Sequence, residues 1–134
     1  MAVQYSTTVR DAANDAIETA VGASPLIKMY SGSMPSNCAA AATGTLLANG
    51  TLPSDWLTSS SSGVKSLNGT WSLTGAATGN LGYYRILNAA GSVCHEQGTI
   101  TATGGGGDLV VDNVSVVSGQ AISITSYSKT FGGA

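Results

Sequence analysis

The sequence predicts a mainly β fold, specifically a jelly-roll-like antiparallel β-sandwich with one short N-terminal amphipathic helix. In the last third of the chain, Ile100 and Ala102, and later Ile122 and Ile124, alternate with small or polar residues. This period of two indicates strands with one buried face. Turn-forming residues separate such runs, including four consecutive glycines at 104–107, and predicted strands recur every ~8–12 residues, which is typical of sandwiches and barrels.

The helix is predicted over residues 7–21. Its apolar residues fall on one stripe, at i, i+3, i+4, i+7, i+8 and i+11: Val9, Ala12, Ala13, Ala16, Ile17 and Ala20. A hydroxyl residue at 6–8 can cap the start, Asp11 is expected in the first turn, and Gly22 is placed to end the helix. The stripe is mostly alanine, so we expect it to pack closely on a sheet or on another helix.

Eight strand segments are expected after the helix: 26–30, 43–52, 64–73, 83–87, 93–103, 109–111, 114–117 and a last one from 120. Asn49-Gly50 inside the second segment indicates a turn or a bulge. In the last segment, Tyr127 and Phe131 have the opposite parity to Ile122 and Ile124. Either a bulge near Ser126 resets this strand, or the two aromatic residues face a second surface such as a partner subunit.

The length of 134 residues predicts one domain over 1–134. Charged residues make up 9 % of the chain, against ~25 % in an ordinary domain. Either neutral polar residues coat an exposed surface, or neighbouring subunits cover much of it. With net charge −2 and five basic residues, nucleic acid is not an expected partner. No apolar run is long enough for a membrane helix, and we expect no secretory signal and synthesis in a cytosol.

Cys38 and Cys94 are the two cysteines. A reducing compartment favours two small buried thiols, and a disulfide is the alternative. Cys94 and His95 are neighbours on a predicted strand, so their side chains point to opposite faces and do not form a catalytic dyad.

No metal site, cofactor or enzymatic activity is expected. Asp108 and Asp112 would lie about 13 Å apart along a strand, too far for a glycosidase pair, which needs roughly 5–10 Å. Calcium binding near these residues is a minor alternative to turn formation. Four aromatic residues would suit either a sugar-binding platform or the core: Trp56, Trp71, Tyr83 and Tyr84.

Several segments resemble the cement (decoration) proteins of tailed-bacteriophage heads, in particular the type found in Bordetella podophages. They are DAANDAIETAVGASPLIKMYSGSMPSNCAAAATGTLLA, LPSDW, SGVKSLNGTW, GYYRILNAAGSVCHEQGTITATGGGGDLVVDN and GQAISITSYSKT, which together cover nearly the whole chain. The resemblance implies a jelly-roll-like fold, no catalytic residues, and a dimer that binds the outside of an HK97-like major capsid shell. The expected location is the outer surface of the virion head, after synthesis in the bacterial host cytoplasm. The alternative function is a carbohydrate-binding β-sandwich module of a phage fibre or surface protein.

Three places are candidates for the contact surface with the major capsid protein or with a second copy. The N-terminal segment is short and apolar, the corner at 52–57 carries an aromatic anchor, and the chain end holds the residues of opposite parity. The candidate residues are Val3, Tyr5, Leu52, Trp56, Leu57, Tyr127 and Phe131. The alternative for each is an ordinary core position.

Overall fold

The computed structural model describes residues 3–132, which form one helix and a set of short strands. In chain order these are α1 (Thr7–Val21), β1 (Leu26–Tyr30), β2 (Leu46–Thr51), β3 (Val64–Ser66), β4 (Trp71–Gly75), β5 (Gly79–Asn80), β6 (Tyr83–Leu87), β7 (Cys94–Ala102), β8 (Leu109–Val111), β9 (Ser115–Val116), β10 (Ala121–Ile124) and β11 (Ser128–Thr130). The predicted mainly β class with one short N-terminal helix is confirmed.

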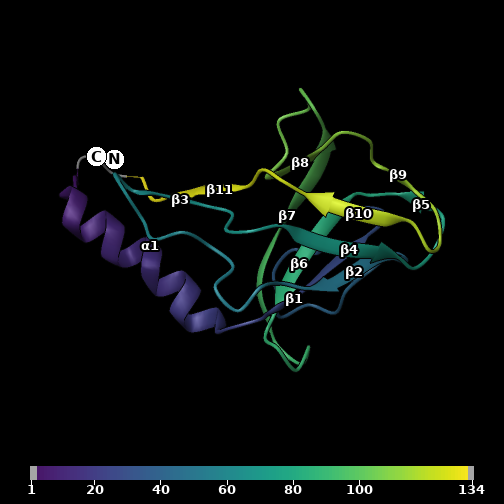
Figure 1. The fold of residues 1–134 in the computed structure, drawn as a ribbon, viewed down its shortest axis with the longest axis horizontal. Coiled ribbons are helices and arrows are strands. Elements are labelled where there is room, and N and C mark those ends of the chain that lie inside the picture. The colour runs from purple at the N-terminus through teal and green to yellow at the C-terminus, as the bar shows by residue number, and fades with distance from the viewer. Residues whose placement is uncertain (1–2, 133–134) are drawn as a thin grey trace.

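Seven strands form one nearly closed sheet in the order β10-β4-β2-β1-β6-β7-β8 (Figure 1), an arrangement consistent with a β-sandwich or barrel-like fold. We call this sheet the barrel. Its pairs are antiparallel except β7 with β8, which run parallel. The expectation of a wholly antiparallel fold is therefore wrong at this pair. The glycine-rich loop at 103–108 carries the chain back along β7, so that β8 starts beside Ile100 and runs in the same direction as β7.

The core fills the inside of the barrel. The side chains of Ile27, Met29, Trp71 and Ile86 have no exposed surface. Alternation is clearest in β4, where Trp71, Leu73 and Gly75 are buried and the two residues between them, Ser72 and Thr74, are exposed. The period-two pattern of the sequence thus identifies the inward side chains of the strands, as expected for a sheet with one wet face.

Asn49 and Gly50 lie inside β2, where they pair with Lys28 and Ile27 of β1. The predicted turn at this position is wrong. A Cβ built on Gly50 would come within 2.4 Å of the carbonyl oxygen of Ser72 on β4. The glycine therefore permits a close approach of two strands rather than a reversal of the chain.

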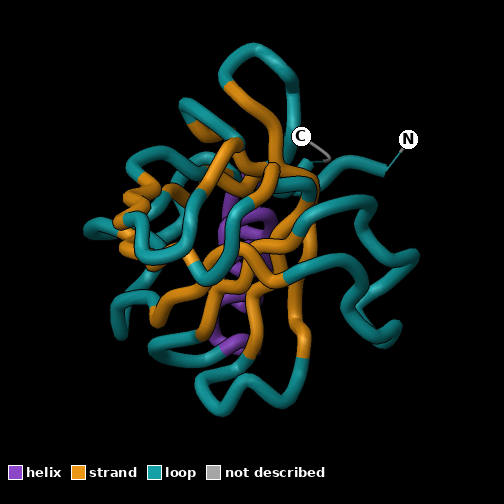
Figure 2. Tube along the Cα trace, turned by 90° about the vertical axis from the view of Figure 1, so that its right-hand side faces the viewer, coloured by secondary structure: helices purple, strands orange, loops and turns teal. Residues whose placement is uncertain are grey.

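The helix lies beside the barrel together with a two-stranded ribbon made of β3 and β11, and the described segments just before α1 and just after β11 lie at the far end of this unit (Figure 1). We call α1, β3 and β11 the arm. Figure 2 shows the same molecule from the side, with the helix behind the strands. The parity change before Tyr127 has a simple cause: β10 ends at Ile124, and residues 125–127 carry the chain from the barrel to β11.

Cys38 and Cys94 form a disulfide, with their Cα atoms 5.3 Å apart. The expectation of two unpaired thiols is wrong. The buried guanidinium of Arg85 donates to the carbonyl oxygens of Asn37, at 3.3 Å, and Ala40, at 2.8 Å. These bonds hold the loop around Cys38 over the start of β7, where Cys94 lies.

Candidate functional site

The helix turns its polar side toward its own chain. Asn14 at the middle of this side is only 1 % exposed. Its amide nitrogen lies 3.2 Å from the carbonyl oxygen of Gly63, 3.3 Å from that of Lys129 and 3.3 Å from the Ser60 hydroxyl. An amide has two N–H donors, so these three acceptors share them. Asn14 thus connects the helix to β11 and to the loop before β3.

Two aspartates on the same side bind the loop before β3. The Asp11 carboxylate accepts from the Gly63 backbone N–H at 2.7 Å and from the Ser60 hydroxyl at 2.8 Å. The Asp15 carboxylate accepts from the Ser60 backbone N–H at 2.9 Å. Asp11 was expected in the first turn of the helix, where the structure has no acidic residue. Its role is instead to satisfy backbone donors of the loop.

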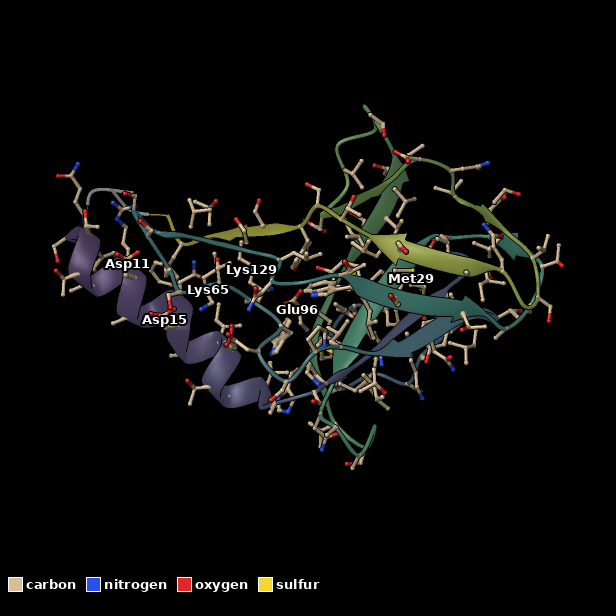
Figure 3. The ribbon with its side chains drawn as sticks, viewed as in Figure 1. Asp11, Asp15, Met29, Lys65, Glu96 and Lys129 are labelled. Carbon is tan, nitrogen blue, oxygen red and sulfur yellow. A yellow bond between two sulfur atoms is a disulfide. The ribbon has the colours of Figure 1, made fainter. Side chains whose placement is uncertain are left out.

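A buried ammonium group connects the helix to β3. Lys65, with a side chain 3 % exposed, lies 2.6 Å from the carboxylate of Asp15 and 3.4 Å from that of Glu18. The hydrogen bond from Lys65 lowers the pKa of Asp15. Burial raises the pKa of Glu18, and the carboxyl of Asp55 adds to this effect against the opposing charge of Lys65. Figure 3 shows Asp11, Asp15 and Lys65 between the helix and the ribbon.

The Glu18→Gln variant is expected to gain in thermal stability relative to the wild type as the pH rises from about 4 to about 7. The folded-state pKa of Glu18 lies above its ordinary value of 4.5. Protonated Glu18 therefore contributes stability below that value, and the contribution is lost as the pH rises through the raised pKa. Melting curves over this pH range test the trend, with a change in the Tm difference of no more than about 3 °C.

Thr19→Gln, on the exposed side of the same turn, is the control for the helix propensity of glutamine. A Tm difference between Glu18→Gln and wild type that stays constant over the pH range would contradict the assigned burial of this carboxyl.

The apolar stripe of the helix faces away from the barrel and the ribbon. Val9 is 48 % exposed. Three of the alanines are exposed as well, and Ala13 is half-buried at the margin, whereas the half-buried Ile17 borders the inner side of the helix, toward Tyr84 and Lys129. We call the outward stripe Val9, Ala12, Ala13, Ala16 and Ala20. The expectation that it packs on a sheet or helix of the same chain is wrong. The loop before β3 turns the backbone N–H groups of Ser60 and Gly63 and the carbonyl oxygen of Ser62 toward the helix, and these groups require polar partners.

A second cluster lies where the arm meets the barrel (Figure 3). The carboxylate of Glu96 on β7 accepts from the hydroxyls of Tyr84, at 2.8 Å, and Tyr127, at 2.5 Å, and from the ammonium of Lys129 on β11. The Lys129 ammonium also lies 2.9 Å from the Tyr127 hydroxyl. The cluster lines an open groove of about 380 Å³ that Ile17 and Phe131 also border.

Burial governs the titration of this cluster. It raises the pKa of Tyr84 to about 12 and also raises that of Tyr127. It lowers the pKa of Lys129 to about 8. The two hydroxyls therefore stay protonated at neutral pH and act as hydrogen-bond donors to Glu96. This arrangement joins the arm to the barrel through polar contacts.

The predicted contact residues divide into two groups. Val3 and Tyr5 are 54 % and 40 % exposed, and the Tyr5 ring lies 6.4 Å from the half-buried ring of Phe131. The other four are buried in the core: Leu52, Trp56, Leu57 and Tyr127. These four cannot supply side chains to an external surface in this structure, which corrects the prediction for them.

The side chain of Trp56 at the corner makes contacts inside the molecule. Its indole N–H donates to the carbonyl oxygen of Gly22 at 3.1 Å, and its ring packs 5.9 Å from that of Trp71. Trp56 therefore fixes the end of the helix to the barrel. Tyr127 packs against Trp71 and Tyr84 at 5.2 and 6.0 Å between ring centres. The residues with opposite parity thus separate, with Tyr127 in the core and Phe131 at the rim.

The other residues considered from the sequence have structural partners. Asp108 accepts from the backbone N–H and the hydroxyl of Thr99 at 2.9 and 3.1 Å. Among residues 3–132, no three His, Cys, Asp or Glu side chains gather as metal ligands. No helix in this range is long and apolar enough to cross a membrane.

Sequence reasoning missed four residues: Asn14 and Lys65, which hold the helix to the rest of the arm, and Glu96 and Lys129, which join the arm to the barrel. A signal for three of them exists. In a chain with 9 % charged residues, a Lys or Glu inside a short predicted strand is unusual and indicates a partner of opposite charge. Asn14 carries no such signal, because a polar residue on a helix is ordinarily solvated.

Together, the fold and these contacts define a mainly β protein with a polar-bonded helical arm that presents an apolar surface outward. No family model matches the chain, and no curated protein or solved structure matches it.

Proposed function

We propose that this chain is a structural virion protein, a cement (decoration) protein that binds the outside of an HK97-like major capsid shell and stabilises it by bridging capsid subunits. The observation that supports this proposal best is the outward stripe of α1. The polar side of this helix makes the contacts within the chain, and its apolar side is exposed. An exposed apolar surface of this kind is typical of a protein-binding site.

The chemistry of the outward stripe suits contact with another protein. It holds no charged side chain, and charge is depleted at the centre of protein interfaces. Its alanines allow a partner backbone to approach closely. Val3 and Tyr5, just before the helix, are exposed too, and Tyr5, whose ring contacts that of Phe131, is an aromatic residue of the kind enriched in interfaces.

In this proposal the partners are the major capsid protein and a second copy of this chain, and the location is the outer surface of the virion head. Each bound copy adds contacts across a seam between capsid subunits. Many copies on one shell act together, because each contact joins subunits that are already held close. Opening the shell under the pressure of packaged DNA then requires breaking these contacts too.

The alternative function, a carbohydrate-binding module, would require accessible aromatic faces. Trp56, Trp71, Tyr83 and Tyr84 are each at most 2 % exposed, so these rings offer no platform to a sugar. No other observation favours this alternative, and we retain the single proposal.

The Ala16→Glu variant is expected to weaken binding to expanded capsids by about tenfold or more. The substitution puts a charge at the centre of the outward stripe, where a partner would have to desolvate it. Because Ala16 is exposed and glutamate is a good helix former, the Tm should stay close to that of the wild type. Co-sedimentation with capsids measures binding, and analytical ultracentrifugation measures the oligomeric state.

Two controls separate charge from position. Ala16→Ser keeps the site small and neutral, and Ser118→Glu adds the same charge on an exposed loop of the barrel. Both should bind as the wild type does. Failure of the wild type to bind expanded capsids, or decorated capsids no more resistant to heat and osmotic shock than stripped ones, would overturn the proposed function.

A further inference from the structure

The barrel has a seam between its two end strands, β8 and β10, which lie on the same side of the molecule (Figure 1). The seam encloses a hollow of about 340 Å³. Its lining comes from the two strands and the segments next to them, including Val110, Val111, Asp112 and residues 120–126. The two ends of the sheet order therefore face one shared space.

The backbone of β10 presents donors and acceptors to this space. The carbonyl oxygen of Gln120 accepts from the N–H of Gly75, so Gln120 points toward β4. Backbone groups alternate sides along an antiparallel strand. With Ile122 and Ile124 paired to β4 in the same phase, the N–H and C=O groups of Ala121 and Ser123 point the other way, into the seam.

The backbone of β8 does the same from the opposite wall. The carbonyl oxygen of Val111 accepts from the N–H of Thr103, which continues β7. The N–H and C=O of Val110, one residue earlier, therefore point away from β7 and toward the seam. Both walls thus offer backbone groups to the seam, those of Ala121 and Ser123 from β10 and those of Val110 from β8.

The side chains around the seam leave it open to a strand. Ile124 and Leu109 are buried below it, and Val110 is 39 % exposed beside it. Natural proteins ordinarily protect such edges with lysine, proline or a bulge. Neither β8 nor β10 contains a lysine or a proline, and Asp112 is the one charged residue among those that line the hollow.

We infer that the seam binds one extended, uncharged segment of the capsid protein, which adds to the barrel as a strand between β8 and β10. This inference rests on the proposed function and names the binding mode of the partner. Main-chain hydrogen bonds supply the attraction in such strand addition, and small pockets for alternate side chains supply the selectivity. An uncharged segment fits because the lining offers no cation and a single carboxylate.

The geometry also fits the task of bridging. The outward stripe lies on the arm and the seam lies on the barrel (Figure 1), so one copy has two separate surfaces for two neighbouring subunits. Residues 3–6 of the same chain lie at the far end of the arm and do not reach the seam of their own copy. In this inference the occupant therefore comes from another chain.

Ser123→Pro tests the inference, because it removes the seam-facing N–H and leaves the bonds between β10 and β4 in place. Proline is accepted in an edge strand where the N–H faces outward. We expect a loss of capsid binding of at least about tenfold. Ser123→Ala, which keeps the N–H, should bind as the wild type does. Ser123→Lys places a long charged side chain beside the seam. It is a second variant that should block binding, in case the proline variant does not fold.

Hydrogen exchange adds a direct readout on the wild type. On binding to capsids, the amides of Val110, Ala121 and Ser123 should become protected, which side-chain contact elsewhere would not cause. If the wild type binds capsids and both Ser123→Pro and Ser123→Lys bind equally well, the inference that the seam binds a strand is overturned. The proposed function would then still stand. No binding by the wild type would overturn both. Loss of a solution dimer in Ser123→Pro, with capsid binding intact, would identify a second copy as the occupant and overturn the capsid segment.

Discussion

Reduction of the Cys38–Cys94 disulfide is expected to lower the free energy of unfolding by about 4 kcal/mol, the value for a closed loop of this length. The two cysteines are 56 residues apart in the sequence. The bond therefore removes a large number of open conformations from the unfolded chain. It also fastens the loop at 31–45 to β7, and the guanidinium of Arg85 on the neighbouring β6 holds two carbonyl groups of the same loop.

Urea unfolding with and without dithiothreitol measures this effect. The Cys38→Ser/Cys94→Ser double variant should unfold at the midpoint of the reduced wild type and should not respond to the reductant. Hydrogen exchange should show faster opening of residues 31–45 than of β1. Equal midpoints for oxidised and reduced wild type would show that the bond contributes nothing to stability.

The Asn14→Leu variant is expected to lose about 2 kcal/mol, because it removes a buried amide with two N–H donors, and each hydrogen bond contributes a net of about 0.5–1.5 kcal/mol. Leucine has a similar size but no donor for the carbonyl oxygens of Gly63 and Lys129. The Oδ1 atom of Asn14 is buried without a hydrogen-bond partner, and its removal offsets a small part of the loss.

The loss should be local to the arm. Amides of β3 and β11 should exchange faster in Asn14→Leu, while those of β1 and β6 keep their protection. Ala16→Leu is the matched control, since it adds the same side chain on the exposed side of the helix and should change the stability by less than about 0.5 kcal/mol. An Asn14→Leu variant as stable as this control would show that the polar side of the helix does not hold the arm.

Local features of the fold could be predicted from the sequence because their causes are local. The helix bounds match at both ends, since Ser6 caps the first turn and Gly22 adopts a φ of 92° just past Val21. Strand positions in the last third also match closely. The alternation of Ile with small polar residues reflects which side chains of a single strand face the core, and this can be read from the strand's own residues. The parity change before Tyr127 was visible too, although its meaning, a passage from barrel to arm, was not.

The site could be predicted only in part. Val3 and Tyr5 are exposed as a contact surface requires, whereas Leu52, Trp56 and Leu57 are core residues. A single aromatic residue in a corner looks the same in the sequence whether it faces a partner or its own helix. The decision for Trp56 depends on the carbonyl of Gly22, 34 residues away along the chain. No periodicity or motif in the sequence indicates a contact between residues so far apart along the chain.

The sequence by itself determined which residues form the helix, where the inward side chains of the barrel lie, and that the chain carries few charges. Only the tertiary structure decided which side of the helix faces inward. Hydrophobic periodicity predicts the apolar side, but the loop before β3 offers the helix the backbone N–H groups of Ser60 and Gly63, and β3 offers the buried ammonium of Lys65. Leaving these groups unpaired would cost more than exposing an alanine stripe, because alanine side chains bury little surface. The helix therefore packs on its polar side, and its apolar side is left for a partner.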